Sequence, residues 1–223
     1  MTKHFQRELK KIKKMILSLG AIVEERVRLA SQAMEDWELD LASKIISSDH
    51  EVDEMEVEIE EECLKILALH QPVAVDLRFI VAVIKINNDL ERIGDQAVNI
   101  AERIESIAKH AAPNETYFDQ YGMAGKAERM LKMSLDALVN LDIDLAFRVL
   151  LLDNEVDAIQ KEAYDRIKMA VKEDPEKVGL LINLLLISRH IERLADHATN
   201  IAEEVIYLIE GEIVRHGNVL ETD

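Results

Sequence analysis

The sequence predicts an all-α protein made of duplicated three-helix bundles: six long antiparallel helices in a tandem pseudo-repeat. Three observations predict this class. Glycine and proline are scarce, at seven and three in 223 residues, whereas a β-rich or doubly wound protein needs frequent turn signals. Apolar residues recur at helical spacing over long stretches. Two kinds of segment also recur at nearly constant offsets, which indicates an internal duplication.

Three prolines and two aspartates divide the chain into helices. Pro72, Pro113 and Pro175 each interrupt a stretch of helical periodicity, because proline breaks the hydrogen-bond ladder of a helix. Softer breaks occur at Asp40 and Asp144, where the aspartate side chain is well placed to cap the helix that follows. The predicted helices span residues 3–37, 39–69, 74–110, 119–141, 144–173 and 176–216.

Apolar stripes along these segments predict how the helices pack. The third predicted helix carries apolar residues at alternating spacings of three and four from Val83 to Ile107, which is a heptad seam. The last predicted helix has a matching apolar seam from Leu184 to Leu208. Seams of this kind are typical of long helices packed at shallow angles in a bundle.

Two repeated blocks define the duplication. Residues 86–104 (INNDLERIGDQAVNIAERI) match residues 187–205 (ISRHIERLADHATNIAEEV) at an offset of 101. Upstream, DHEVD at 49–53 recurs as DNEVD at 153–157, at an offset of 104. The halves meet near residue 112, and two up-down-up bundles are expected side by side. The predicted domains are a first three-helix bundle, 1–112, and a second three-helix bundle, 113–223.

Net charge, cysteine content and the apolar stretches limit which partners and which cellular compartment are expected. The net charge is −17, which excludes nucleic acid as a partner, because affinity for nucleic acid comes mostly from cations that neutralise phosphates. The single cysteine, Cys63, lies in an apolar helical phase and is expected to be a buried, inert thiol. The basic N-terminus lacks the apolar core of a signal peptide, and no apolar stretch is long enough to span a bilayer. A cytoplasmic protein is expected.

Acidic pairs are the candidate functional residues. Four segments carry an acid and an aspartate four residues later, a spacing that places both side chains on one face of a helix. A single pair means little, because a charged helix face is normally just solvated. These pairs stand at matching positions of both halves and adjoin the apolar seams. They are Asp49/Asp53, Glu91/Asp95, Asp153/Asp157 and Glu192/Asp196.

Carboxylates crowded beside a core carry a free-energy cost that something must offset. Like charges at this spacing destabilise even an isolated helix by about 0.2–0.5 kcal/mol. A bound cation, raised pKa values, or arginines such as Arg92 and Arg193 would each offset it. Ligands that are all oxygen favour hard cations, or iron in an oxygen-rich cluster. From spacing alone, two interpretations remain possible. The acids form a metal site, or they form a charged rim whose carboxylates pair with arginines.

Known catalytic motifs are missing from the sequence. Di-iron carboxylate bundles use Glu-x-x-His on two helices, and no histidine here has a glutamate three residues before it. The sequence also has no Gly-rich phosphate loop, no HExxH and no GxSxG. These absences count against an enzyme.

The doubled motifs resemble those of the PhoU family, the phosphate-signalling regulators associated with bacterial phosphate ABC transporters. The resemblance rests on LERIGD (90–95) and IERLAD (191–196), each followed by Asn-Ile-Ala-Glu (99–102 and 200–203), with DHEVD and DNEVD ahead of them. It covers nearly the whole chain, and it is specific because order, spacing and duplication agree.

The resemblance implies a pair of three-helix bundles that hold metal ions in multinuclear clusters, of iron or zinc. The ligands would be E/D-x-x-x-D motifs on the second and third helices of each half. Gln96 stands where the family often has a histidine, whereas His197 keeps it, so the first site is expected to differ in detail. Carried over by position, the metal ligands are Asp49, Asp53, Glu91, Asp95, Asp153, Asp157, Glu192 and Asp196, with Asn99, Asn200, Arg92 and Arg193 as outer candidates.

The resemblance also implies a non-enzymatic function. Such a regulator links a phosphate ABC transporter, through its ATPase subunit, to a membrane sensor histidine kinase, and keeps phosphate-starvation genes off when phosphate is plentiful. A homodimer is expected, with membrane contact only through partners. Two alternatives stay open: a carboxylate-bridged metalloenzyme such as a phosphohydrolase, and a purely structural bundle whose motif acids are rim charges.

Overall fold

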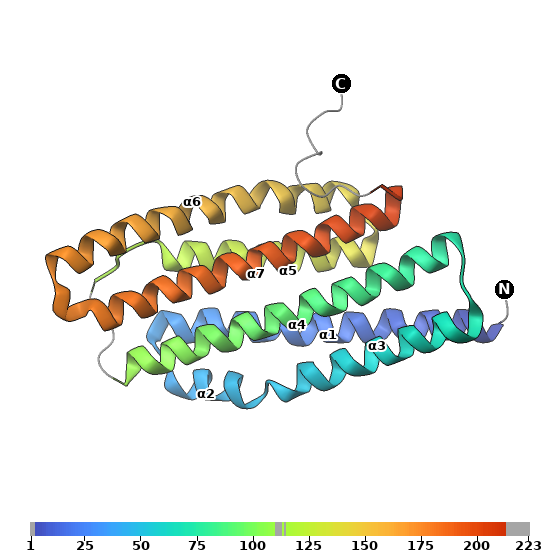
Figure 1. The fold of residues 1–223 in the computed structure, drawn as a ribbon, viewed down its shortest axis with the longest axis horizontal. Coiled ribbons are helices and arrows are strands. Elements are labelled where there is room, and N and C mark those ends of the chain that lie inside the picture. The colour runs from blue at the N-terminus through green and yellow to red at the C-terminus, as the bar shows by residue number, and fades with distance from the viewer. Residues whose placement is uncertain (1–2, 110–112, 114, 213–223) are drawn as a thin grey trace, which may run out of the picture.

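The computed structural model describes residues 3–109, 113 and 115–212 and confirms the all-α architecture. Figure 1 shows long antiparallel helices in one elongated bundle, with α1 to α4 on one side and α5 to α7 on the other. The part of the chain described here contains no β-strand. The helices are α1 (Lys3–Asp36), α2 (Leu39–Ser47), α3 (His50–His70), α4 (Ala74–Ala108), α5 (Gln120–Asn140), α6 (Ile143–Glu173) and α7 (Val178–Glu210), with a 3₁₀ turn, η1 (Pro175–Lys177).

The prolines lie where helices end, as predicted. Pro72 lies between α3 and α4, and Pro113 between α4 and α5. Pro175 begins the 3₁₀ turn before α7, a position where its missing N–H costs little. The predicted helix end at residue 110 and the predicted boundary at residue 112 lie outside the described residues. The last helix, predicted to run to residue 216, ends at Glu210, because Gly211 takes a left-handed conformation with φ 79° and caps it.

The second predicted helix, 39–69, is interrupted in the structure. It breaks at Ser48 and Asp49 into α2 and α3, whereas α6, its counterpart in the second half, runs without a break. At the break, Nη2 of the buried Arg26 donates to the Ser48 carbonyl oxygen at 2.5 Å. That oxygen also accepts from the backbone N–H of Glu51 at 3.2 Å, a tighter turn than that of an α-helix, so a residue of α1 contacts the chain at the break.

The predicted capping by Asp40 and Asp144 is wrong. Both aspartates lie within the first turn of their helices. The cap of α6 is Asp142, whose Oδ1 accepts from the backbone N–H of Leu145 at 3.0 Å. The preceding helix, α5, ends at Asn140 and is followed by Leu141, which has a left-handed φ of 52°. The chain reverses at that residue, so the next helix starts earlier than the sequence suggests.

The heptad seams form the core, as predicted. Every seam residue of α4 from Val83 to Ile107 is buried, and the seam of α7 is buried from Leu184 to Val205. These two helices make the most extensive contact between any pair of helices in the bundle. Cys63 is fully buried, as predicted, and burial raises the pKa of its thiol to about 12, which disfavours the reactive thiolate. None of the described helices is long and apolar enough to cross a membrane.

Candidate functional site

The motif acids of the first half lie between α3 and α4. Asp49 is the N-cap residue of α3, and Asp53 follows one turn later. Glu91 and Asp95 lie one turn apart on α4, which packs against α3. Burial raises the pKa of Asp49, and the nearby Asp53 carboxylate raises it further. Burial and neighbouring carboxylates act in the same direction on Glu91 and Asp95. The structure therefore brings these four acids within electrostatic reach of one another.

A buried arginine that the sequence analysis missed reaches this site from α1. The Arg26 residue is only 3% exposed, and its Nη1 donates to Oδ1 of Asp49 at 3.1 Å. Its charge opposes the rise that burial causes in the pKa of Asp49 and of Asp95. Arg26 follows Val23 by three residues, where the alternating apolar stripe of α1 would place its next core residue. A cation at a core position was the available signal.

Two of the outer candidates of the first half contact the motif. Arg92 approaches Glu91, with Nε 3.4 Å from Oε2, and Asp95, with Nη1 3.5 Å from Oδ2. Its side chain is half exposed, so these ion pairs are weak. Nδ2 of Asn99 donates to the backbone oxygen of Asp95 at 2.8 Å and not to its carboxylate.

The motif acids of the second half lie between α6 and α7. Burial, with the nearby carboxylates of Asp157 and Asp196, raises the pKa of Asp153 to about 6. Burial, with the charges of Glu192 and Asp157, raises the pKa of Asp196 to about 6. The charge of Arg193 acts against this rise. These four acids therefore also share one electrostatic environment, and it is the more costly of the two for ionised carboxylates.

Two buried carboxylate oxygens bear on whether a cation fits these sites. Oε2 of Glu91 and Oδ1 of Asp153 are buried without a hydrogen-bond donor. Glu91 has Arg92 nearby, so Asp153 is the clearer case. A buried anionic oxygen without a donor is costly, and a metal ion would satisfy it. Among the described residues, however, no three acidic, histidine or cysteine side chains are placed to hold one ion together. Metal binding would need motif side chains to turn toward one another.

Polar residues also join the two halves across α4 and α7. Oδ1 of Asp89 lies 2.9 Å from Nδ1 of His197, and Oε1 of Gln96 lies 2.9 Å from Nδ1 of His190. Positions 89 and 190 correspond through the 101-residue offset, and so do positions 96 and 197. The two contacts are therefore reciprocal. The departure at Gln96 falls in this interface, where its amide oxygen contacts the ring of His190 and not an acid.

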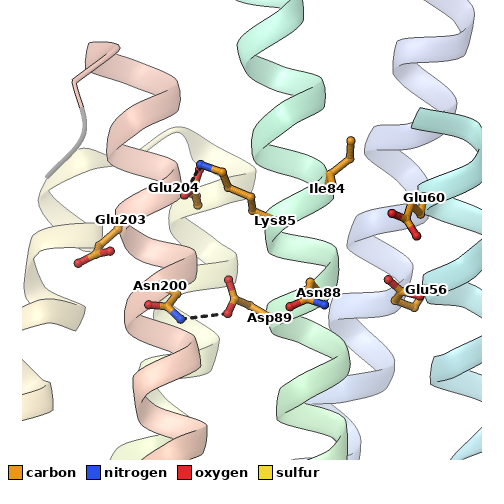
Figure 2. Close-up of a pocket in the computed structure, with 9 residues that line it drawn as sticks. All are labelled: Glu56, Glu60, Ile84, Lys85, Asn88, Asp89, Asn200, Glu203 and Glu204. Atoms are coloured by element: carbon orange, nitrogen blue, oxygen red, sulfur yellow. Dashed lines mark hydrogen bonds and ion pairs between the residues drawn. The ribbon is translucent and has the colours of Figure 1, made fainter. Parts of the chain in front are cut away.

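An acidic groove of about 660 Å³ opens beside this interface, between α3, α4 and α7 (Figure 2). Within it, Nζ of Lys85 on α4 contacts the two carboxylate oxygens of Glu204 on α7 at 2.9 and 3.1 Å. Asn200, an outer candidate, donates to Asp89 here at 3.0 Å. The structure thus places Asn200 in the groove, in contact with no motif carboxylate. The groove is lined by Glu56, Glu60, Ile84, Lys85, Asn88, Asp89, Asn200, Glu203 and Glu204.

The fold and the repeated acids define a duplicated helical bundle with two neighbouring E/D-x-x-x-D pairs in each half. A family described as the PhoU domain matches residues 16–104 and 121–205. The two matches fall in the two halves of the bundle, and together they cover most of the chain. The chain belongs to the PhoU family.

Curated relatives agree over nearly the full length. A phosphate-specific transport system accessory protein PhoU homolog of Pseudomonas aeruginosa is 36% identical, over 97% of this chain and 89% of its own. Homologs with the same description from Aquifex aeolicus and Clostridium acetobutylicum are 37% and 35% identical, over 96% and 95% of this chain and 97% of their own.

Solved structures give the same result. The crystal structure of PhoU from Pseudomonas aeruginosa superposes with a TM-score of 0.89 at 35% identity, covering 93% of this chain and all of that one. The phosphate transport system regulatory protein PhoU from Streptococcus pneumoniae superposes with a TM-score of 0.84 at 29% identity, covering 95% of this chain and all of that one. The relatives are named as accessory and regulatory proteins of a phosphate transport system.

Proposed function

We propose that this protein regulates phosphate uptake and phosphate-starvation signalling without catalysing a reaction. The observation that carries the proposal is the PhoU domain in both halves, together with full-length relatives named as accessory proteins of a phosphate-specific transport system. In this role the protein works in the cytoplasm as a homodimer. It contacts the ATPase subunit of a phosphate ABC transporter and a membrane sensor histidine kinase, and it keeps starvation genes off while phosphate is plentiful.

The eight motif carboxylates are proposed to hold iron or zinc in a multinuclear cluster in each half. Asp49, Asp53, Glu91 and Asp95 would supply the first site, and their counterparts on α6 and α7 the second. Support comes from the raised pKa values and from the buried Oδ1 of Asp153, which has no hydrogen-bond donor. Bound cations would neutralise the crowded carboxylates and tie α3 to α4, and α6 to α7.

Affinity capture from cells tests the partners. Tagged full-length protein is expected to recover a transporter ATPase and a sensor kinase, with yields that differ between phosphate-replete and phosphate-starved cells. A strain lacking the protein should express a phosphate-starvation reporter in rich phosphate, and the wild-type chain should restore repression.

A catalytic result would overturn the proposal. If capture recovers neither partner and the metal-loaded protein hydrolyses phosphate esters with multiple turnovers, the phosphohydrolase hypothesis replaces the regulator. That turnover would have to be abolished by Asp95→Ala, because the substitution would not affect a contaminating phosphatase.

Light scattering on the purified chain checks the homodimer, and a monomer at cellular concentration would contradict it.

A further inference from the structure

We infer that the two acidic sites bind metal with unequal affinity. Arg26 weakens metal binding at the first-half site, so the second-half site binds metal more tightly. The inference rests on the metal role proposed above and names the residue that sets affinity within it. It follows from a difference between the halves at one corresponding position.

The register of the two halves identifies that position. Helices α1 and α5 both end at a residue in the left-handed conformation, Trp37 with φ 54° and Leu141 with φ 52°. These residues are 104 positions apart, the same offset as the DHEVD and DNEVD blocks. The same offset pairs Arg26 with Met130, and these residues are 3% and 0% exposed. One half therefore buries a guanidinium where the other buries a thioether.

Neighbouring groups in the first half hydrogen-bond to the Arg26 side chain and leave space for it. It donates to Oδ1 of Asp49 at 3.1 Å and to the Ser48 carbonyl at 2.5 Å, where the helix breaks. A Cβ at Gly94 would lie 3.6 Å from Nη1 of Arg26 and 3.3 Å from Cγ1 of Val52. The glycine leaves space beside the guanidinium, and the corresponding residue on α7 is Ala195. The arginine, the glycine and the helix break thus form one local arrangement.

This arrangement competes with a metal ion for the same oxygen. A dication that approached Asp49 would have to displace the guanidinium, leaving a buried charge without this partner, or bind beside a fixed positive charge. In the second half Oδ1 of Asp153 has no hydrogen-bond donor, and the carboxylate's hydrogen bond is with the neutral hydroxyl of Thr199, so a metal ion need not displace a guanidinium there. The second site is therefore expected to fill first, with an affinity about tenfold higher or more.

Manganese binding to two single-site proteins tests the inequality. Free aqueous Mn²⁺ is measured by its electron paramagnetic resonance signal during titration of each full-length protein. The double variant Asp49→Asn/Asp95→Asn keeps the second site, and Asp153→Asn/Asp196→Asn keeps the first. The second-site protein is expected to bind Mn²⁺ about tenfold more tightly or better. Equal affinities, or a tighter first site, would overturn the inference.

Substitution of the arginine tests the cause. In the first-site protein, Arg26→Met is expected to tighten Mn²⁺ binding by about tenfold, because it removes the competing charge and installs the side chain that the second half uses. Arg26→Lys keeps a cation and should leave binding weak. In the second-site protein Arg26→Met should change nothing. No tightening in the first-site protein would refute the role of Arg26.

The controls separate the inference from the functions on which it rests. Circular dichroism and the urea midpoint of each variant check the fold, and if Arg26→Met does not fold, the comparison of the two single-site proteins still decides. Failure of the wild type and of both single-site proteins to bind Mn²⁺ would overturn this inference and count against the metal sites. The capture and reporter experiments would still test the regulatory role independently.

Discussion

The carboxyl group of Asp153 keeps its proton up to a higher pH than the carboxyl group of an ordinary surface aspartate. Burial and neighbouring carboxylates raise its pKa in the folded protein from the ordinary 3.8 to about 6. A carboxyl with a raised folded-state pKa stabilises the fold in full below its unfolded pKa, and this contribution is lost as pH rises through the folded pKa. Without metal, the protein should therefore lose stability between about pH 4 and pH 6.

Asp153→Asn should remove part of this loss. With a chelator present at pH 7, the variant is expected to be more stable than the wild type by about 1 kcal/mol, after allowance for the partial exposure of the site. Below pH 4 the gain should vanish, because the wild-type carboxyl is then protonated. Urea unfolding from pH 4 to 7.5 measures this. Asp165→Asn, an exposed acid on the same helix, is the control, and an equal gain there would contradict the explanation.

Individual helices begin and end at short-range contacts that are open to direct test. The N-terminus of α6 is capped by Asp142, whereas Asp144 lies in the first turn and makes no such contact with the backbone. Asp142→Ala should destabilise the protein by about 1 kcal/mol, and Asp144→Ala by only about 0.3 kcal/mol through the helix dipole. Urea midpoints compare the two, and the opposite order would restore the cap predicted from sequence.

Glycines inside helices give a second test at the same scale. A Cβ at Gly125, within α5, would meet no other atom within 4 Å, so Gly125→Ala should stabilise the protein by about 0.5–1 kcal/mol. At Gly94 the same change brings Cβ to 3.3 Å from Cγ1 of Val52, and the packing cost should cancel that gain. Thermal unfolding of both variants distinguishes them. Equal stabilisation would mean that Gly94 is not tightly packed.

The molecule as a whole is held together where α4 meets α7. The contact combines two buried apolar seams with polar pairs, which include the ion pair between Lys85 and Glu204. The Glu204 side chain is only 5% exposed, so its carboxylate depends on the ammonium more than a surface acid would.

Lys85→Met should therefore destabilise the whole bundle. A cost of about 1–2 kcal/mol is expected, reduced from that of a fully buried pair because Lys85 is itself partly exposed. The matched control is Lys65→Met, which breaks a more exposed pair with Glu62 on one helix and should change stability by less than about 0.5 kcal/mol. Urea unfolding by circular dichroism measures both. Similar costs would show that the interface pair contributes no more than a surface pair.

Helix positions and core seams were predictable from the sequence. Both depend on local signals, since helical periodicity and the effect of proline involve residues only a few positions apart. The repeat also located the four acids of each half, since residues on neighbouring helices of a bundle face each other through their seams. The division into two domains near residue 112 stays a prediction. So does the metal role of the motif acids.

Features that depend on contacts between distant segments were not predictable from local patterns. The carbonyl at the Ser48 break accepts from a side chain of α1, and the interface role of His197 needs Asp89 from the other half. Asn200 shares a motif with Asn99, yet the groove around it is shaped by three helices. Local rules describe each helix, but the partner of a polar side chain depends on which helices pack together.

The reciprocal contacts across α4 and α7 obey the rule of a two-fold axis. In a symmetric dimer, residue i of one copy meets residue j of the other, and j meets i. Positions 89 and 197 meet, and so do their counterparts 190 and 96. The two halves of this one polypeptide therefore contact each other in the way that the two subunits of a symmetric dimer do. Because the two copies mutate separately, one can bury Arg26 and the other Met130, which identical subunits encoded by one short gene could never do.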